Sequence, residues 1–396
     1  MTVEDARRLA KRRQPRIVFD FIDGAALDER AMALNRSSLA SVRLQPRVLR
    51  DVSQRDLGAT VLGQEFSLPF GVAPMGMAGL AWPGTDAALA KAAIEFGFPL
   101  CTSTAASMAL ETTRGIAGNH AWFQLYVGAS RDSSLMFVRR ARDAGYETLL
   151  LTVDGPQLSR RIREIRNGFT VPFRIGTRQF LDFATHPRWS ISMLASGIPS
   201  LANNRRADPH GHFVRGVDRS GADWDFLHRL RKEWPGKLVV KGVMNSDDAA
   251  RIREAGADGI YVSNHGGRQL DSAPSSISAL PGIRKTVGPD YPLLFDSGVR
   301  GGEDIVKAYA LGADFVFLGR PFLYALGAGG EAGLKAIIRI LSEEVSLAMA
   351  QIGVTSISEI DTEAIAPSEH GRRTPPAAPA SPNAKSREEG RSSTPS

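Results

Sequence analysis

Eight short runs of β-branched, aromatic and aliphatic residues recur along the chain, and this recurrence limits the possible fold more than any other feature of the sequence. Amphipathic segments of helical length lie between most of them. Strands that alternate with helices are typical of a parallel sheet. Eight such units in roughly 260 residues predict a TIM (β/α)8 barrel. The runs are residues 69–73, 98–103, 121–126, 147–153, 237–241, 259–263, 291–296 and 314–318.

Three junctions between a predicted helix and the next strand share one pattern. Gly145, Gly256 and Gly312 each follow Ala or Leu and each precede an acidic residue by two positions. Glycine at such a place is expected to end the helix in a left-handed turn. Repeated βα units explain this pattern better than two unrelated domains.

One connection is much longer than the others. Residues 171–222 separate the fourth strand from the helix before the fifth and mix large apolar side chains with arginines. A connection of this length in a compact domain is usually functional. Three interpretations stay open: an active-site lid, an element that lies on a membrane surface, and an oligomer contact.

The remaining organisation follows from composition. Residues 367–396 are rich in Pro, Ala, Ser and Arg without periodicity and are expected to be a disordered tail. Residues 1–366 are therefore predicted to form one barrel domain with the insertion 171–222. Length alone also permits two smaller domains.

Composition also bears on location and partners. Cys101 is the single cysteine, no run of 18 apolar residues occurs, and the N-terminal residues are charged. These features favour a cytoplasmic setting without a membrane span. The net charge of +7 lies partly in the tail. Since no aromatic or helical reading element accompanies it, no nucleic-acid partner is expected.

Catalytic groups of a TIM barrel gather where the strands end. The residues at these eight ends are polar, titratable and predicted to converge. In chain order they are Pro74, Met75 and Gly76; Ser103 and Thr104; Gln124 and Tyr126; Thr152 and Asp154; Lys241; Ser263 and His265; Asp296, Ser297 and Gly298; and Gly319 and Arg320.

The stretch from Ser263 to Asp271 places an imidazole and a guanidinium three positions apart after an apolar run. His265 is a candidate base, and Asp154 is the candidate carboxylate that orients its ring. Arg268 and Arg161 are candidates for binding a substrate carboxylate in a planar fork. The plainer alternative is a capped strand-to-helix turn with two permissive glycines.

A phosphate site is predicted after the last two strands. Residues 298–302, with Arg300, and the Gly319-Arg320 pair offer backbone N–H groups and guanidinium to a dianion. Neither a GxGxxG after a strand nor a Walker A sequence appears. His210 and His212 are interpreted as polar residues of a loop rather than as metal ligands, and no metal site is predicted.

These motifs resemble the family of FMN-dependent 2-hydroxy acid dehydrogenases and oxidases, which includes glycolate oxidase and the L-lactate and (S)-mandelate dehydrogenases. The resemblance covers roughly residues 3 to 365. The motifs are residues 263–271 (SNHGGRQLD), 123–126 (FQLY), 151–154 (LTVD), 240–242 (VKG) and 296–300 (DSGVR).

The resemblance implies FMN as cofactor and oxidation of an L-2-hydroxy acid to the 2-oxo acid. His265 would take a proton from the substrate hydroxyl or α-carbon, and Asp154 would support the imidazolium that forms. The resemblance leaves open whether the electrons leave the substrate through a carbanion or as a hydride. Tyr126 would contact the substrate oxygen, and Lys241 would offset negative charge at the reduced flavin. Ser103, Gln124, Thr152 and Ser263 would contact the ring or hold Lys241. Asp296, Arg300, Gly319 and Arg320 would bind the ribityl phosphate, and the strand-end residues Pro74, Met75, Gly76, Ser297 and Gly298 complete the expected FMN site.

Two positions concern the substrate. Phe21 stands where the family usually has a tyrosine whose hydroxyl donates to the substrate carboxylate, and a lost hydrogen bond to a charged group costs about 1.5–3 kcal/mol if nothing replaces it. Ala105 stands where short-chain oxidases often carry a bulky aromatic residue. The Phe21 position leaves open which 2-hydroxy acid, lactate- or mandelate-like, is the substrate, and Ala105 favours an acid with an aryl or long side chain.

The resemblance also concerns partners. The insertion falls where membrane-bound members carry a docking segment and pass electrons to the respiratory chain, which favours a dehydrogenase that reduces a quinone and lies peripherally on the inner face of the membrane. A homotetramer is expected. The alternatives are an oxidase that reduces O2 to hydrogen peroxide, a flavin-bound TIM-barrel isomerase, and a flavin- or phosphate-binding protein without turnover.

Overall fold

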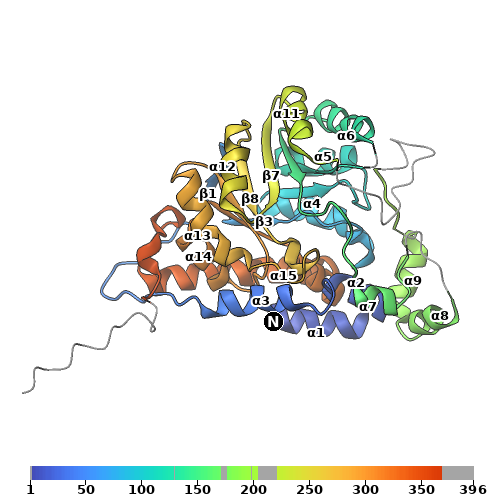
Figure 1. The fold of residues 1–396 in the computed structure, drawn as a ribbon. Coiled ribbons are helices and arrows are strands. Elements are labelled where there is room, and N and C mark those ends of the chain that lie inside the picture. Colours follow the sequence, from blue (N-terminus) through green and yellow to red (C-terminus); the bar gives the residue numbers. More distant parts are fainter. Residues whose placement is uncertain (1, 129, 171–175, 198, 204–220, 368–396) are drawn as a thin grey trace, which may run out of the picture.

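The computed structural model describes residues 2–128, 130–170, 176–197, 199–203 and 221–367. Eight parallel strands close into a barrel (Figure 1). The last strand pairs with the first, with Val316 opposite Phe70, so the sheet has no free edge. The predicted TIM barrel is confirmed. In barrel order the strands are β3 (Phe70–Val72), β4 (Leu100–Ser103), β5 (Ala121–Tyr126), β6 (Thr148–Thr152), β7 (Lys237–Val243), β8 (Gly259–Val262), β9 (Leu293–Phe295) and β10 (Phe315–Leu318).

Helices surround the barrel, one or more after each strand (Figure 1). The three junction glycines have φ of +86° (Gly145), +83° (Gly256) and +104° (Gly312), as their spacing predicts. A side chain disfavours this left-handed region, which is why glycine ends these helices. The helices are α4 (Thr85–Phe96), α5 (Leu110–Ala117), α6 (Arg131–Asp143), α11 (Trp224–Glu233), α12 (Ser246–Glu254), α13 (Ser276–Val287), α14 (Gly302–Ala310) and α15 (Arg320–Ile352).

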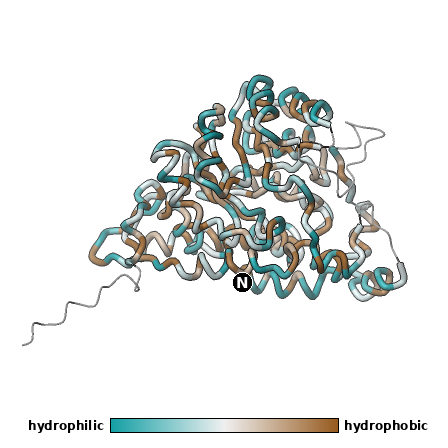
Figure 2. The backbone as a smooth tube through the Cα atoms, in the orientation of Figure 1, coloured by the Kyte–Doolittle hydropathy of each residue, from teal (hydrophilic) through white to brown (hydrophobic). Residues whose placement is uncertain are grey.

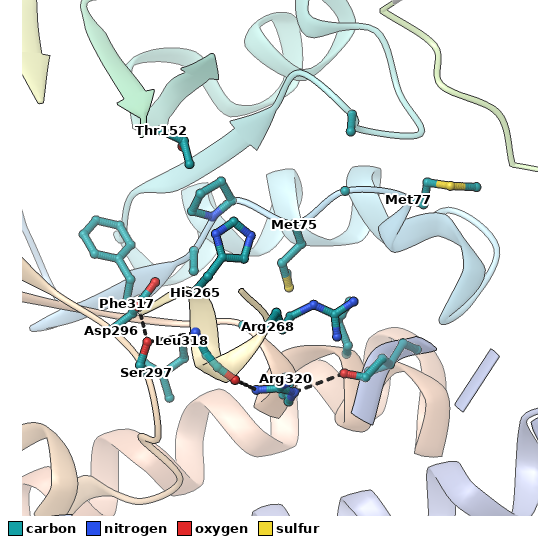
Figure 3. A pocket seen from close by; sticks show the side chains of 18 of the residues that line it. Met75, Met77, Thr152, His265, Arg268, Asp296, Ser297, Phe317, Leu318 and Arg320 are labelled. Atoms are coloured by element: carbon teal, nitrogen blue, oxygen red, sulfur yellow. Dashed lines mark hydrogen bonds between the residues drawn. The ribbon is translucent and has the colours of Figure 1, made fainter. Parts of the chain in front are cut away.

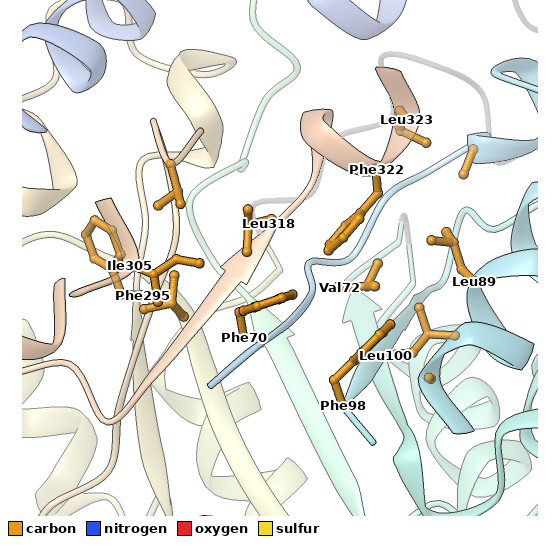
Figure 4. Close-up of a cluster of buried hydrophobic side chains, with 14 of the residues drawn as sticks. Phe70, Val72, Leu89, Phe98, Leu100, Phe295, Ile305, Leu318, Phe322 and Leu323 are labelled. Atoms are coloured by element: carbon orange, nitrogen blue, oxygen red, sulfur yellow. The ribbon is translucent and has the colours of Figure 1, made fainter. Parts of the chain in front are cut away.

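The core has two layers, one on each side of the strands. Phe70, Val72 and Leu318 of the barrel wall pack outward against Phe322 of α15 and Leu89 of α4 (Figure 4). Inside the barrel, a second cluster includes Trp122, Tyr261 and Phe317, all of them fully buried. Large side chains therefore fill the barrel interior below its mouth, as expected for a packed barrel rather than a pore.

The N-terminal segment contributes to both ends of the barrel. Helices α1 (Val3–Arg13), α2 (Arg16–Asp23) and α3 (Arg30–Ser41) come first, and α1 packs along α15 (Figure 1). A hairpin of β1 (Ala59–Val61) and β2 (Gln64–Phe66) follows, and Phe66 contacts Trp122 and Phe315 at the bottom of the interior. The mouth at the opposite end stays available for ligands.

The described parts of the insertion form two helices, α8 (Thr177–Ala184) and α9 (Pro187–Ser196), after the short α7 (Ile162–Arg166). They project from the barrel in Figure 1. Asp182 of α8 accepts from the backbone N–H groups of Arg16 and Ile17, and Trp189 of α9 donates to the carbonyl of Leu80. Hence this part of the insertion is anchored on α2 and on the loop after β3. Except for residue 367, the predicted tail 367–396 lies outside the described residues.

In the part of the chain that the structure describes, no helix combines the length and the apolar character needed to cross a bilayer.

Candidate active site

A cavity of about 230 Å³ opens at the mouth of the barrel, where the strands end (Figure 3). Most of the side chains predicted from the strand ends line it. They are Pro74, Met75, Gly76, Tyr126, Thr152, Lys241, His265, Asp296, Ser297, Gly298, Gly319 and Arg320, joined by Phe21, Ala105, Arg161, Arg268 and Arg300. Five other predicted residues, Ser103, Thr104, Gln124, Asp154 and Ser263, lie behind this lining and hydrogen-bond to one another or to members of it.

His265 connects two other side chains at the centre of the cavity. Its Nδ1 lies 2.9 Å from Asp154 Oδ1, and its Nε2 lies 3.2 Å from the hydroxyl of Tyr126. An ionised carboxylate only accepts hydrogen bonds, so the ring proton belongs on Nδ1. The lone pair of Nε2 is then directed at the tyrosine hydroxyl, where a substrate proton can be taken up.

The surroundings of this pair keep the imidazole neutral and the carboxylate ionised. Burial lowers the pKa of His265 below its usual value of 6.5, although Asp154 opposes the shift. Burial alone would raise the pKa of Asp154, but its interaction and hydrogen bond with His265, together with the Lys241 charge, outweigh burial and lower that pKa. A buried neutral imidazole beside a fixed anion is the form that acts as a base.

The loop that carries His265 is held in a strained conformation. His265 itself has φ of +59°, a region that non-glycine residues rarely occupy and that costs about 1–3 kcal/mol. Its N–H donates to Ser263 Oγ (3.0 Å). Asn264 exchanges two amide hydrogen bonds with Asn35 of α3 (2.7 and 2.9 Å), and Asp271 accepts from the N–H of Ala31 in the first turn of α3. Part of the 263–271 motif therefore serves to dock α3.

Lys241 extends from β7 into the floor of the cavity. Its ammonium donates to Ser263 Oγ (2.7 Å) and lies 3.4 Å from Asp296 Oδ2. Burial would lower its pKa, but Asp296 and Asp154 raise it above the usual value, so Lys241 stays charged. Gly242 follows at φ +103°, and a Cβ there would lie 2.5 Å from the Cβ of Asp154. Glycine is thus required for Asp154 to reach His265.

A row of buried polar side chains supports the floor. Ser103 donates to the Oε1 of Gln124, and the Nε2 of Gln124 donates to Thr152 Oγ1, both at 2.9 Å. This row orients the amide of Gln124, so its carbonyl and N–H2 ends are fixed. Only Thr152 of the three borders the cavity.

Two arginines meet over one buried carboxylate that the sequence reasoning did not single out. Glu164 Oε1 lies 3.1 Å from Arg268 Nη2 and 3.5 Å from Arg161 Nη1. Arg268 also donates to the carbonyls of Phe21 and Gly24. Burial lowers the pKa of Arg161 to about 10, so it remains a cation at neutral pH. The signal available in sequence was the position of Glu164, one helical turn after Arg161.

An aromatic pair forms another wall. Phe21 stacks on Phe169 with a centroid distance of 4.5 Å and an interplanar angle of 5°, and the guanidinium of Arg268 lies 5.5 Å from the Phe21 ring. Phe169, with Met77, Leu158, Leu201 and Leu323, lines the cavity without having been predicted. Leu201 belongs to the insertion. Asn203, two positions later in the insertion, donates to the carbonyls of Ser103 and Thr104. Such apolar residues resemble ordinary core residues in sequence.

The part of the cavity beyond the ends of β9 and β10 is rich in cationic side chains. Arg320, at the start of α15, donates to the carbonyls of Ile22, Gly24 and Gly266 (Figure 3). Arg300 lines the same end, and Arg36 of α3, which was not predicted, donates to the carbonyl of Gly298 and pairs with Asp304 at 3.5 Å. Guanidinium groups beside a helix N-terminus suit a phosphate dianion.

These residues fit FMN. The cationic end matches a ribityl phosphate, Asp296 and Ser297 hydrogen-bond to each other beside it at 2.7 Å, and Thr152 and Lys241 form a polar, buried part of the floor. The cofactor supplies a two-electron acceptor when it is bound. His210 and His212 lie outside the described residues, and among the described ones no group of three metal-binding side chains occurs.

Comparison with known proteins agrees with this site. Residues 10–367 match the family model described as FMN-dependent dehydrogenase. The (S)-mandelate dehydrogenase of Pseudomonas putida is 40% identical over 368 residues, covering 91% of this chain and 92% of that protein. The L-lactate dehydrogenase of Pseudomonas syringae pv. syringae (strain B728a) is 37% identical over 369 residues, covering 91% and 97%.

A solved structure shares the whole fold. The crystal structure of the monotopic membrane protein (S)-mandelate dehydrogenase superposes with a TM-score of 0.87 at 39% identity, covering 92% of this chain and 98% of that one. The resemblance that the motifs indicate, the FMN cofactor and the assignment as an oxidoreductase are confirmed. The chain belongs to the FMN-dependent dehydrogenase family.

Proposed function

We propose that this protein oxidises an L-2-hydroxy acid to the 2-oxo acid, with His265 as the base. The observation that carries this proposal is the placement of His265 between Asp154 and Tyr126, in a cavity that two arginines also border. The isomerase alternative does not need paired guanidinium groups for a carboxylate. A binding protein without turnover does not need a strained, buried base.

Each residue has a role in this proposal. Arg161 and Arg268 bind the substrate carboxylate, which directs the substrate hydroxyl to His265 Nε2. Nε2 takes the proton, and Asp154 stabilises the imidazolium that forms. The Tyr126 hydroxyl contacts the substrate oxygen. Lys241 opposes the negative charge that the two transferred electrons bring.

The experiment is an anaerobic addition of substrates to the FMN-loaded protein. (S)-mandelate, L-lactate and a longer L-2-hydroxy acid are added separately, and the flavin absorbance is followed. We expect at least one of them to bleach the flavin, with the D enantiomers as controls. Bleaching by none of them would contradict the proposal.

The walls of the cavity favour an aryl or long side chain. Phe21, Phe169, Leu158 and Leu201 present apolar surface, and Ala105 leaves space that a bulky residue would fill. Burying a phenyl group against such walls contributes about 1.5–3 kcal/mol relative to leaving it exposed. We therefore expect (S)-mandelate to reduce the flavin with a higher kcat/KM than L-lactate.

Phe21→Tyr tests the substrate wall directly. A hydroxyl on this ring offers a further hydrogen bond to the carboxylate, which is worth about 1.5–3 kcal/mol when one partner is charged. We expect the KM for L-lactate to fall about tenfold or more, measured by steady-state kinetics. Phe169→Tyr is the matched control, because it adds the same hydroxyl to the other ring of the stack. An unchanged KM in Phe21→Tyr would show that the carboxylate does not lie near this ring.

The pH dependence follows from the His265 pKa. Because that pKa is lowered and the base must be neutral, kcat/KM is expected to fall with decreasing pH only below pH 6.5. Asp154 raises the His265 pKa, so Asp154→Asn lowers it further and moves this limb to lower pH. The plateau also drops by about 100-fold or more, since the imidazolium loses its stabilising anion. If the acidic limb of the kcat/KM profile moved to higher pH in Asp154→Asn, this would contradict the pairing of Asp154 with His265.

We also infer that the protein lies on a membrane surface through α8 and α9. Phe180, Leu181, Ile191 and Leu194 are 65–76% exposed on these two helices, whose projection in Figure 2 mixes hydrophobic with hydrophilic stretches. The exposed Arg178 and Arg188 suit anionic headgroups. This location favours a membrane quinone over O2 as the acceptor of electrons from the reduced flavin. Comparing the rate at which a quinone analogue reoxidises the reduced flavin with the rate in air distinguishes the two acceptors.

Sedimentation with vesicles tests the docking. The double variant Ile191→Ser/Leu194→Ser removes two exposed apolar side chains from one helix face, so binding to phosphatidylethanolamine–phosphatidylglycerol vesicles is expected to weaken about 100-fold. Val48→Ser/Leu49→Ser is the matched control, since those side chains are at least as exposed but lie outside the insertion. Equal weakening in both variants would refute a specific docking surface.

A further inference from the structure

The Tyr261 ring packs against the ammonium of Lys241 inside the barrel. Lys241 Nζ lies 4.8 Å from the centroid of the Tyr261 ring, within the range of a cation–π contact. Both side chains are buried, with exposed fractions of 3% for Lys241 and 0% for Tyr261. Water therefore does not screen the contact, and desolvated cation–π contacts are the strong ones.

Strand register places Tyr261 beside the lysine. In the β7–β8 pair, Lys241 lies opposite Tyr261, and Ser263 comes two positions after Tyr261, directly behind the end of β8. The lysine side chain thus passes from the tyrosine ring towards the Ser263 hydroxyl, its hydrogen-bond partner at 2.7 Å. The Tyr261 ring and the Ser263 hydroxyl contact the ammonium at two different heights along the barrel axis. The carboxylate of Asp296, directly after the neighbouring strand β9, lies 3.4 Å from it.

Packing alone does not explain a tyrosine at this position. Burial and the nearby Asp296 carboxylate raise the pKa of the Tyr261 hydroxyl well above its usual value, and this hydroxyl makes no hydrogen bond within the usual distance and angle limits among the described residues. Burying a hydroxyl without a hydrogen bond costs about 1–3 kcal/mol. Aliphatic residues such as Leu150, Val239 and Leu294 fill other places in the same cluster without that cost. What they lack is an electron-rich ring face.

We propose that Tyr261 is a positioning residue for Lys241, whose ring face keeps the buried ammonium at the height where it borders the FMN site. This inference rests on the proposed function, in which Lys241 opposes negative charge on the reduced cofactor. Without the ring, the ammonium is free to sink into the space that the ring fills in the interior cluster, away from the cavity. Its field at the cofactor then weakens, and the reduced form of the cofactor loses stabilisation.

Sulfite affinity and the flavin midpoint potential test this without substrate turnover. Sulfite adds its sulfur lone pair to N5 of oxidised flavin, and the displaced electron pair leaves negative charge at N1 and the C2 oxygen, where a cation stabilises it. In Tyr261→Leu, we expect sulfite affinity to weaken by about twofold to thirtyfold, the range of one cation–π contact. The same factor lowers the midpoint potential by about 10–45 mV, at about 30 mV per factor of ten for two electrons.

Two further variants separate the ring from the hydroxyl and from packing. Tyr261→Phe keeps the ring face and is expected to stay within about twofold of the wild type. Phe315→Leu makes the same kind of aromatic-to-aliphatic change in the same interior cluster without contacting Lys241, and it should leave both readouts unchanged. If Tyr261→Leu does not fold with FMN, Tyr261→Met, whose unbranched and flexible side chain adapts better to the space left by the ring, carries the same expectation.

The outcomes are distinct. Wild-type sulfite affinity and potential in Tyr261→Leu or Tyr261→Met, or an equal loss in Phe315→Leu, would overturn the role of Tyr261. Failure of the proposed function appears instead in the wild type, as a flavin that no L-2-hydroxy acid bleaches. A low potential in Tyr261→Leu together with a normal one in Tyr261→Phe supports the ring face as the positioning element.

Discussion

Replacing His265 with glutamine is expected to leave FMN bound but to slow flavin reduction by the substrate by about 100- to 10,000-fold, the usual contribution of a positioned base. Glutamine keeps a polar group near Asp154 and Tyr126 but has no basic nitrogen. His265 borders the cavity beside Lys241 and Asp296, yet neither of them hydrogen-bonds to its ring, so the cofactor site should survive. Stopped-flow absorbance under anaerobic conditions measures the effect.

A matched control separates the base from a general loss of histidine. His228→Gln changes an exposed histidine on α11 that does not line the cavity, and the flavin of this variant should be reduced at the wild-type rate. The FMN content of each variant is taken from its absorbance spectrum. A His265→Gln protein that keeps FMN and is reduced within about tenfold of the wild type would remove His265 as the base.

Arg161→Met is expected to lower kcat/KM for (S)-mandelate by about 30-fold to several thousandfold, because removing one partner of a buried charge pair costs about 2–5 kcal/mol. Arg161 is largely buried, and its Nε has no hydrogen-bond partner among the described residues. A buried donor without a partner beside the cavity is suited to a ligand carboxylate. Methionine keeps much of the side-chain volume and removes the charge.

Two comparisons sharpen this prediction. Arg160→Met removes the same charge from an exposed neighbour and should leave kcat/KM unchanged. The methyl ester of (S)-mandelate carries no carboxylate, so the penalty of Arg161→Met should be much smaller with it than with the acid. Equal losses on the acid and the ester would mean that Arg161 supports the fold rather than the substrate.

The barrel was predictable because its signals are local. Each buried strand reads as a short apolar run, and each junction glycine reports a left-handed turn that its own backbone requires. Once the barrel is recognised, the position of a residue at a strand end brings it to one mouth, whatever its distance in sequence. Asp154, Lys241 and His265 were found in this way, and their separation of up to 111 positions did not hide them.

The second layer of the site was not predictable to the same degree. Glu164 appears in sequence as one charge in a basic stretch, and Phe169 and Leu201 appear as ordinary apolar residues. Their importance depends on which side chains they meet after folding, namely Arg161 and Arg268 for Glu164 and Phe21 for Phe169. Arg36 likewise reaches the phosphate end from α3, an element outside the βα repeat.

The sequence by itself determined the barrel, the family and the set of groups at the strand ends, since periodicity, turn glycines and motif spacing are properties of the chain alone. Only the tertiary structure decided how those groups are held: Asn35 and Asp271 docking α3 on the His265 loop, Glu164 joining two arginines, and Tyr261 beneath Lys241. Such contacts join elements far apart in the chain. They depend on distance and burial, which a linear pattern does not contain.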